Sequence, residues 1–106
     1  MINNLKTAPE LRNGHRDKKR LALIAAMPCI ACKVSGKNQV MRTEVHHLMG
    51  CGLGLKASDL KTIPLCSYHH VKGNRGEAVH SGVKSFEKVF GTQNELLEMV
   101  NKLLEA

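Results

Sequence analysis

Two pairs of metal-binding side chains repeat one spacing in this sequence. Cys29 and Cys32 are separated by two residues, and Cys66 and His69 have the same separation. Two thiolates at this spacing form a knuckle that holds a tetrahedral zinc ion from one side, and the second pair can supply the other side. The four residues together therefore predict a closed Cys₃His site for structural Zn²⁺.

Further histidines stand close to the second pair along the chain. His46 and His47 are adjacent, His70 follows His69 directly, and His80 comes later. Together with the three cysteines, eight metal-capable side chains fall within about half of the sequence. This density of ligands predicts more than one metal site.

The composition leaves a role for a structural metal in stabilising the fold. The chain has 106 residues, which predicts one domain, and it contains no Trp, one Tyr and two Phe. A metal that links distant segments would offset this lack of large core side chains. No apolar run is long enough for a membrane span and the first residues do not resemble a signal peptide, so we expect a cytoplasmic protein with no membrane partner and with reduced cysteines.

The net charge of +7 is unevenly distributed. Residues 84–106 carry three basic against four acidic side chains, so the positive excess lies in residues 1–83, beside the expected metal sites. This distribution favours a polyanion such as nucleic acid as the partner, although a solvated basic surface is an alternative. The side chains that we expect to contact DNA phosphates are Arg12, Arg16, Lys18, Lys19, Arg20, Lys61, Lys72 and Arg75.

The first half of the chain predicts an arm, a helix and a pair of strands. Residues 1–16 are polar and basic and are expected to form a flexible arm. Asp17 can cap a helix over residues 18–27, which Pro28 would end. Residues 40–47 and 60–65 predict two antiparallel strands, joined by a glycine-rich loop that includes Cys51, which we expect to be a free thiol. The cysteine knuckle is expected to run into a polar turn over residues 33–38.

The second half predicts helices. The segment from Cys66 to Val71 is expected to start a helix that carries the metal ligands, and Ser81 can cap a helix over residues 81–90. Thr92 and Glu95 form a capping box for a last helix over residues 93–105. The apolar stripe of that helix predicts a core face, or alternatively the contact surface of a homodimer.

The pattern of strands, glycine-rich loop and histidine pairs resembles the HNH endonucleases, whose fold is the ββα-metal finger. More narrowly, the segment from Thr62 through His70, with His80 and residues 86–91 behind it, is similar to the small phage nucleases of recombination enhancement that depend on a RecA-type recombinase. The resemblance covers residues 27–91. It implies an α+β fold, a small zinc-stabilised ββα-metal finger flanked by helices, with residues 17–106 as the nuclease domain.

The resemblance also implies roles for single residues. In that family the first histidine of the pair binds a catalytic divalent ion and the second is the general base, which corresponds to His46 and His47 here. Further ligands are implied at His70 and His80, with Asn74 as the reserve ligand. The ion would be Mg²⁺, Mn²⁺ or Zn²⁺. It would polarise the phosphodiester and neutralise the departing oxygen, while a histidine with a pKa near neutrality deprotonates the water.

One position departs from the family pattern. Lys61 stands where the family has the asparagine that orients the general base, so Asp59 or Thr62 is expected to hold the imidazole of His47 instead. A nuclease of this kind would act on DNA, together with a recombinase filament, in the cytoplasm of a bacterial host if it is phage-encoded.

Two alternatives remain open at the level of sequence. The first is a zinc-stabilised DNA-binding or adaptor module without catalysis, in which the histidines are structural. The second is a nuclease with the same site that acts on RNA. His47 separates the first alternative from an enzyme, because a binding module does not need an imidazole beside a three-histidine metal shell.

Overall fold

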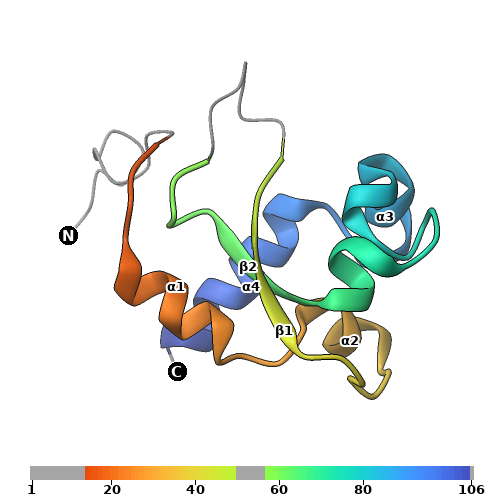
Figure 1. Ribbon diagram of the computed structural model, residues 1–106, viewed down its shortest axis with the longest axis horizontal. Coiled ribbons are helices and arrows are strands. Elements are labelled where there is room, and N and C mark those ends of the chain that lie inside the picture. The colour runs from red at the N-terminus through yellow and green to blue at the C-terminus, as the bar shows by residue number, and fades with distance from the viewer. Residues whose placement is uncertain (1–13, 50–56, 106) are drawn as a thin grey trace.

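A two-stranded antiparallel sheet lies at the centre of the computed structural model, which describes residues 14–49 and 57–105 (Figure 1). β1 (Thr43–His47) pairs with β2 (Thr62–Cys66), with Thr43 opposite Cys66 and His47 opposite Thr62. The predicted antiparallel pair is thus confirmed. β1 begins later than predicted because Val40 is 91% exposed and has no strand to pack against.

Four α-helices surround this sheet. In Figure 1, α4 passes behind the strands, α1 lies at one end of them, and α2 and α3 lie toward the other. α1, α2 and α4 all contact β2, which is buried along its whole length. The helices are α1 (Lys18–Ala25), α2 (Ile30–Ser35), α3 (Val83–Phe90) and α4 (Gln93–Glu105).

The core joins β2 to the helices around it. Leu96 and Val100 of α4 are fully buried, and Leu97 and Leu104 pack against the same cluster, so the stripe of α4 is a core face as predicted. Burial of each such side chain contributes about 1.5–3 kcal/mol. The largest apolar members of the core are Ile24, Ile30, Ile63, Leu65, Val79, Phe86, Leu96 and Val100.

Two of the predicted helix caps are present. The Asp17 side chain accepts a hydrogen bond of 3.1 Å from the Arg20 N–H at the start of α1. In the capping box of α4, the Thr92 N–H donates to the Glu95 side chain (2.8 Å) and the Glu95 N–H donates to Thr92 Oγ1 (3.1 Å). These bonds satisfy N–H groups that have no partner inside their helices.

The prediction that Ser81 caps the next helix was wrong. Ser81 ends the short 3₁₀ helix η4 (Val79–Ser81), and its hydroxyl donates to the Gly73 carbonyl at 2.7 Å. Gly82 takes the cap position of α3. The hydroxyl therefore ties the turn after β2 to η4, a contact that local sequence does not indicate.

The polar turn was predicted over residues 33–38, but its first three residues belong to the helix α2. Cys29 is its N-cap, because the Cys29 sulfur accepts a hydrogen bond from the Cys32 N–H (3.4 Å). Gly36 ends the helix with φ of 72°, a conformation that glycine adopts without steric cost. The knuckle therefore starts a helix that continues to Ser35.

The helix after β2 is a short π-helix, η3 (Tyr68–Lys72). It ends at Gly73, whose N–H donates to the Tyr68 carbonyl at 2.8 Å and where an added Cβ would lie 2.8 Å from the same oxygen. Asn74 lies beyond this end. The expectation that Asn74 follows His70 by one turn on the same helix was therefore wrong.

Part of the predicted arm is described and is held by the loop before β2. The Asp59 N–H donates to the His15 carbonyl at 2.9 Å, and Arg16 forms an ion pair with Asp59. Arg12 and Cys51 lie outside the described residues. No helix in the described ranges is long and apolar enough to cross a membrane.

Candidate metal centres and active site

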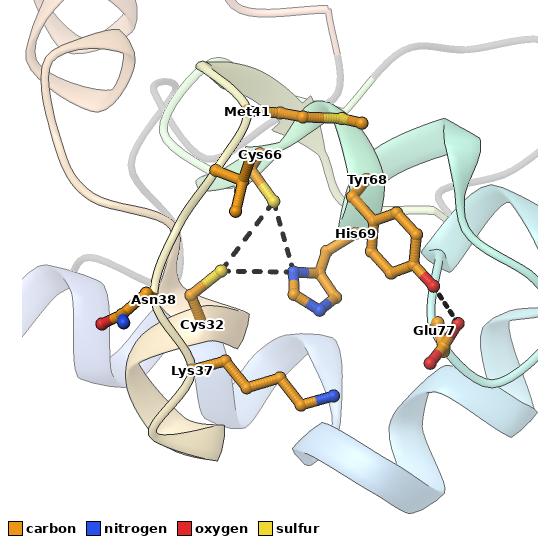
Figure 2. A pocket seen from close by; sticks show the side chains of 9 residues that line it. Cys32, Lys37, Asn38, Met41, Cys66, Tyr68, His69 and Glu77 are labelled. Atoms are coloured by element: carbon orange, nitrogen blue, oxygen red, sulfur yellow. Dashed lines mark hydrogen bonds between the residues drawn. The ribbon is translucent and has the colours of Figure 1, made fainter.

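The Cys₃His residues come together at the junction of α2, β2 and η3. Cys29, Cys32, Cys66 and His69 are all buried, and one ligand atom from each lies within 4.8 Å of the others. His69 Nδ1 lies 3.6 Å from the Cys29 sulfur, 3.5 Å from that of Cys32 and 3.3 Å from that of Cys66, and the Cys32 and Cys66 sulfurs are 3.9 Å apart. Figure 2 shows Cys32, Cys66 and His69 pointing toward one another.

These distances fit a tetrahedral zinc ion. Zn–S bonds of about 2.3 Å and Zn–N bonds of about 2.0 Å separate tetrahedral ligand atoms by about 3.5–3.8 Å. The four separations given above, from 3.3 to 3.9 Å, lie around that range. The four residues could therefore hold zinc.

Burial disfavours the ionised form of the cysteines in this cluster. Burial raises the pKa of the Cys29 thiol, and burial together with the neighbouring sulfurs of Cys29 and Cys66 raises the pKa of Cys32 to about 12. Burial and the charge of Lys37 lower the pKa of His69, so its imidazole is neutral at pH 7. A bound cation is what allows such buried thiols to ionise, and its uptake releases their protons.

A second cluster contains three histidines from three elements. His46 of β1, His70 of η3 and His80 of η4 have ring centroids 4.8–5.4 Å apart, and one nitrogen from each lies within 4.8 Å of the others. Burial, opposed by the hydrogen bond with Gln93, lowers the pKa of His46 to about 4, and burial also lowers that of His80. Neutral imidazoles are the form that binds a metal, so this group can hold a divalent ion.

His47 directly follows His46 and is the last residue of β1. Its Nε2 lies 2.7 Å from Asp59 Oδ1. Asp59 is 1% exposed, and it also accepts hydrogen bonds from Arg16 Nη1 (2.6 Å) and from the Asp17 N–H (2.7 Å). Burial opposes ionisation of Asp59, but the hydrogen bonds from His47 and Asp17 hold its pKa below the ordinary value.

Of the two residues expected to orient His47, only Asp59 contacts it among the bonds of the described residues. The Thr62 hydroxyl donates to the Asp59 carbonyl at 2.7 Å and accepts from Arg20 Nε at 3.2 Å. Thr62 therefore supports the turn that carries Asp59. It acts on the imidazole of His47 only through that turn.

Comparison with known proteins gives one family match. A family model described as "Recombination enhancement, RecA-dependent nuclease" matches residues 14–105. This chain belongs to the RecA-dependent nuclease family.

One relative in this comparison is an uncharacterized protein of Escherichia coli (strain K12), YdfU. It is 32% identical over 77 residues, which make up 70% of this chain. The matched segment spans 19% of the length of YdfU. No solved structure matches the chain.

Two residues that contact the histidine cluster of this RecA-dependent nuclease family member were not predicted from the sequence. Glu44 Oε1 lies 2.8 Å from His70 Nδ1, and Gln93 Oε1 lies 2.8 Å from His46 Nε2. The hydrogen bond with His70 lowers the pKa of Glu44. Glu44 precedes His46 by two residues, so strand alternation could have placed both on one face, whereas Gln93 has no comparable local signal.

Two of the expected DNA contacts are engaged within the protein. The Arg16 guanidinium donates to Asp59 and to the Ala57 carbonyl. Arg20 donates to the Thr62 hydroxyl, to the Thr62 carbonyl and to Asn101, which joins α1 to β2 and α4. Of the other basic candidates, Lys18, Lys19, Lys72 and Arg75 are exposed and Lys61 is half-buried.

Replacing Asp59 by alanine is expected to lower the free energy of unfolding by about 3 kcal/mol, because it leaves the Asp17 N–H and Arg16 Nη1 without their acceptor. Urea denaturation would measure the loss. Glu98→Ala, at an exposed position of α4, is the control and should change the midpoint little. An unchanged midpoint for Asp59→Ala would contradict the structural importance of these bonds.

Proposed function

We propose that this chain is a metal-dependent DNA endonuclease module of the HNH type that acts in recombination with a RecA-type recombinase. The observation that carries the proposal is the hydrogen bond between His47 and Asp59, because His47 directly follows His46 of the histidine cluster at the end of β1. Hydrolysis needs both a cation site and a base, and these two neighbouring histidines can supply one each.

In this proposal the histidine cluster holds the catalytic ion through His46, His70 and His80. The ion, which is Mg²⁺, Mn²⁺ or Zn²⁺, supplies a positive charge that polarises the phosphodiester and stabilises the departing oxygen. Asn74 remains the reserve ligand, although it lies in the turn after η3. Zn²⁺ in the Cys₃His site is structural, because all four of its ligand positions belong to the protein.

His47 is the proposed general base, and its tautomer follows from Asp59. An ionised carboxylate only accepts hydrogen bonds, so the His47 nitrogen that faces Asp59, Nε2, carries the proton. Nδ1 then has the free lone pair that takes a proton from water as the water oxygen bonds to phosphorus and the bond to the departing oxygen breaks. Asp59 stabilises the imidazolium that results.

Of the basic residues singled out in the sequence, those whose side chains donate no hydrogen bond within the described residues are proposed to contact DNA phosphates. These are Lys18, Lys19, Lys61, Lys72 and Arg75, while Arg16 and Arg20 act within the fold. The phosphate-contact role of Arg12, which lies outside the described residues, rests on the sequence alone.

Salt dependence tests this contact surface. Each phosphate contact releases about one counterion, so replacing Lys18 and Lys19 by alanine should reduce the slope of log affinity against log salt by about two. Fluorescence anisotropy with a labelled duplex measures the slope. Lys84→Ala with Lys88→Ala, in α3, removes the same charge outside the proposed surface and should leave the slope closer to wild type. Equal slopes for both pairs would exclude Lys18 and Lys19 as phosphate contacts.

The function itself is tested by plasmid nicking with the full chain. Activity is expected with Mg²⁺ or Mn²⁺ and a RecA filament, and is expected to be lost with a chelator. Binding to DNA without nicking under every metal and filament condition would instead favour the alternative, a zinc-stabilised DNA-binding or adaptor module. Cleavage of RNA in preference to DNA would overturn the proposed substrate.

A further inference from the structure

The amide of Gln93 determines which nitrogen of His46 is protonated. Gln93 Oε1 accepts a hydrogen bond from the Met49 backbone N–H at 3.0 Å. Because a backbone N–H can only donate, the amide atom that it contacts is the oxygen. The same oxygen lies 2.8 Å from His46 Nε2. Because an amide oxygen only accepts, Nε2 must be the N–H of His46, and the lone pair is on Nδ1.

Glu44 determines the tautomer of His70 in the opposite sense. Its Oε1 lies 2.8 Å from His70 Nδ1, and its Oε2 accepts a hydrogen bond from the Ser67 hydroxyl at 2.8 Å. A carboxylate only accepts, so His70 Nδ1 carries the proton and the lone pair is on Nε2. Ser67, which is 7% exposed, limits rotation of the carboxylate.

We propose that Glu44 and Gln93 are positioning residues that set opposite tautomers, so that His46 offers Nδ1 and His70 offers Nε2 to the shared metal site. This inference rests on the proposed function, since it concerns the same three-histidine site. Neither residue is a ligand. Each acts through the imidazole that it holds, in the way that outer partners of metal-bound histidines commonly orient a ring and raise its basicity.

The two partners come from different parts of the fold, which gives α4 a role at the site. Glu44 shares β1 with His46 and contacts His70 of η3. Gln93 is the first residue of α4, and its backbone N–H donates to the Glu87 side chain of α3 at 2.7 Å. The N-terminus of α4 thus carries a buried polar side chain to His46 in addition to its core face.

The tautomers are measured by long-range ¹⁵N–¹H NMR of the histidine rings in the full chain, loaded with one equivalent of zinc and with no other divalent ion. We expect protonated Nε2 at His46 and protonated Nδ1 at His70. Gln93→Leu should convert His46 to a mixture, and Gln93→Glu, which keeps an acceptor oxygen, should restore the wild-type pattern. Protonated Nδ1 at His46 or protonated Nε2 at His70 in the wild type would overturn the proposal.

Metal affinity provides the second readout. Calorimetric titration with Co²⁺ should show a 10- to 100-fold weaker site in Glu44→Ala, while Glu44→Gln, which keeps an acceptor, should lose less. Glu98→Ala controls for the loss of one acidic side chain, and zinc content with the thermal midpoint verifies folding. Unchanged Co²⁺ affinity in folded Glu44→Ala would exclude a positioning role for Glu44.

These measurements separate the inference from the proposed nuclease activity. The expected tautomers with no plasmid nicking would refute the enzyme while leaving the positioning residues in place. Nicking with the opposite tautomers would support the enzyme and refute the positioning roles of Glu44 and Gln93. If Gln93→Leu does not fold, the wild-type and Gln93→Glu spectra still decide the assignment for His46.

Discussion

Replacement of Cys29 by serine is expected to leave most of the chain unfolded. Cys29 belongs to the Cys₃His group, so its loss opens the proposed zinc site, whereas the serine hydroxyl can still accept the N-cap hydrogen bond of α2. Binding of structural zinc contributes on the order of 10 kcal/mol in small metal-dependent domains. The whole free energy of unfolding of a domain is about 5–15 kcal/mol, so this loss would consume most of it.

Circular dichroism, thermal unfolding and zinc content measure this effect. Cys51→Ser is the matched control, because Cys51 has no second ligand at knuckle spacing in the sequence. It should retain zinc and the wild-type midpoint. A zinc-free Cys29→Ser protein with an unchanged spectrum and midpoint would refute the structural role of the zinc.

His47→Ala is expected to reduce the rate of plasmid nicking by about 10²–10⁴ while metal content stays unchanged. His47 is 19% exposed and holds its place through Asp59, so its removal takes away the proposed base without opening either cluster. The rate is measured under conditions where chemistry limits turnover, with a recombinase filament present. Calorimetric titration and DNA binding are measured on the same sample.

His70→Ala is the contrasting variant, because it removes a proposed ligand of the catalytic ion. It should lose Co²⁺ binding at the histidine cluster while zinc in the Cys₃His site is retained. Added Mg²⁺ or Mn²⁺ should not restore its activity. If His47→Ala nicks as fast as wild type, His47 is not the base, and loss of its metal would show that it acts as a ligand instead.

The Cys₃His cluster and two of the helix caps could be predicted from the sequence because they depend on local spacing. Two residues between Cys29 and Cys32 place both sulfurs on one side of a single turn, and Cys66 and His69 repeat that geometry. The cap at Asp17 is equally local, because its side chain accepts a hydrogen bond from the N–H three residues later in the chain. The helix α2 was not predicted, because Cys29 was interpreted only as a metal ligand. Its sulfur also caps this helix.

The sequence also indicated that a histidine cluster exists, through the resemblance, but only the tertiary structure decided its partners. Asp59 rather than Thr62 contacts His47, and Gln93 reaches His46 from the far end of the chain. Arg20 turns inward to Thr62, although its place in a basic run indicated a phosphate contact.

The physical reason is the distance in sequence over which these contacts form. His46 and Gln93 are 47 residues apart, and they meet only because α4 packs its apolar face on β2. No local spacing in the sequence predicts a hydrogen bond of this kind. The position of Gln93 depends on the burial of Leu96 and Val100, which fixes α4 against β2. The sequence therefore determined which residues can bind metal. The packing of α4 and β1 against β2 determined which side chains contact those residues.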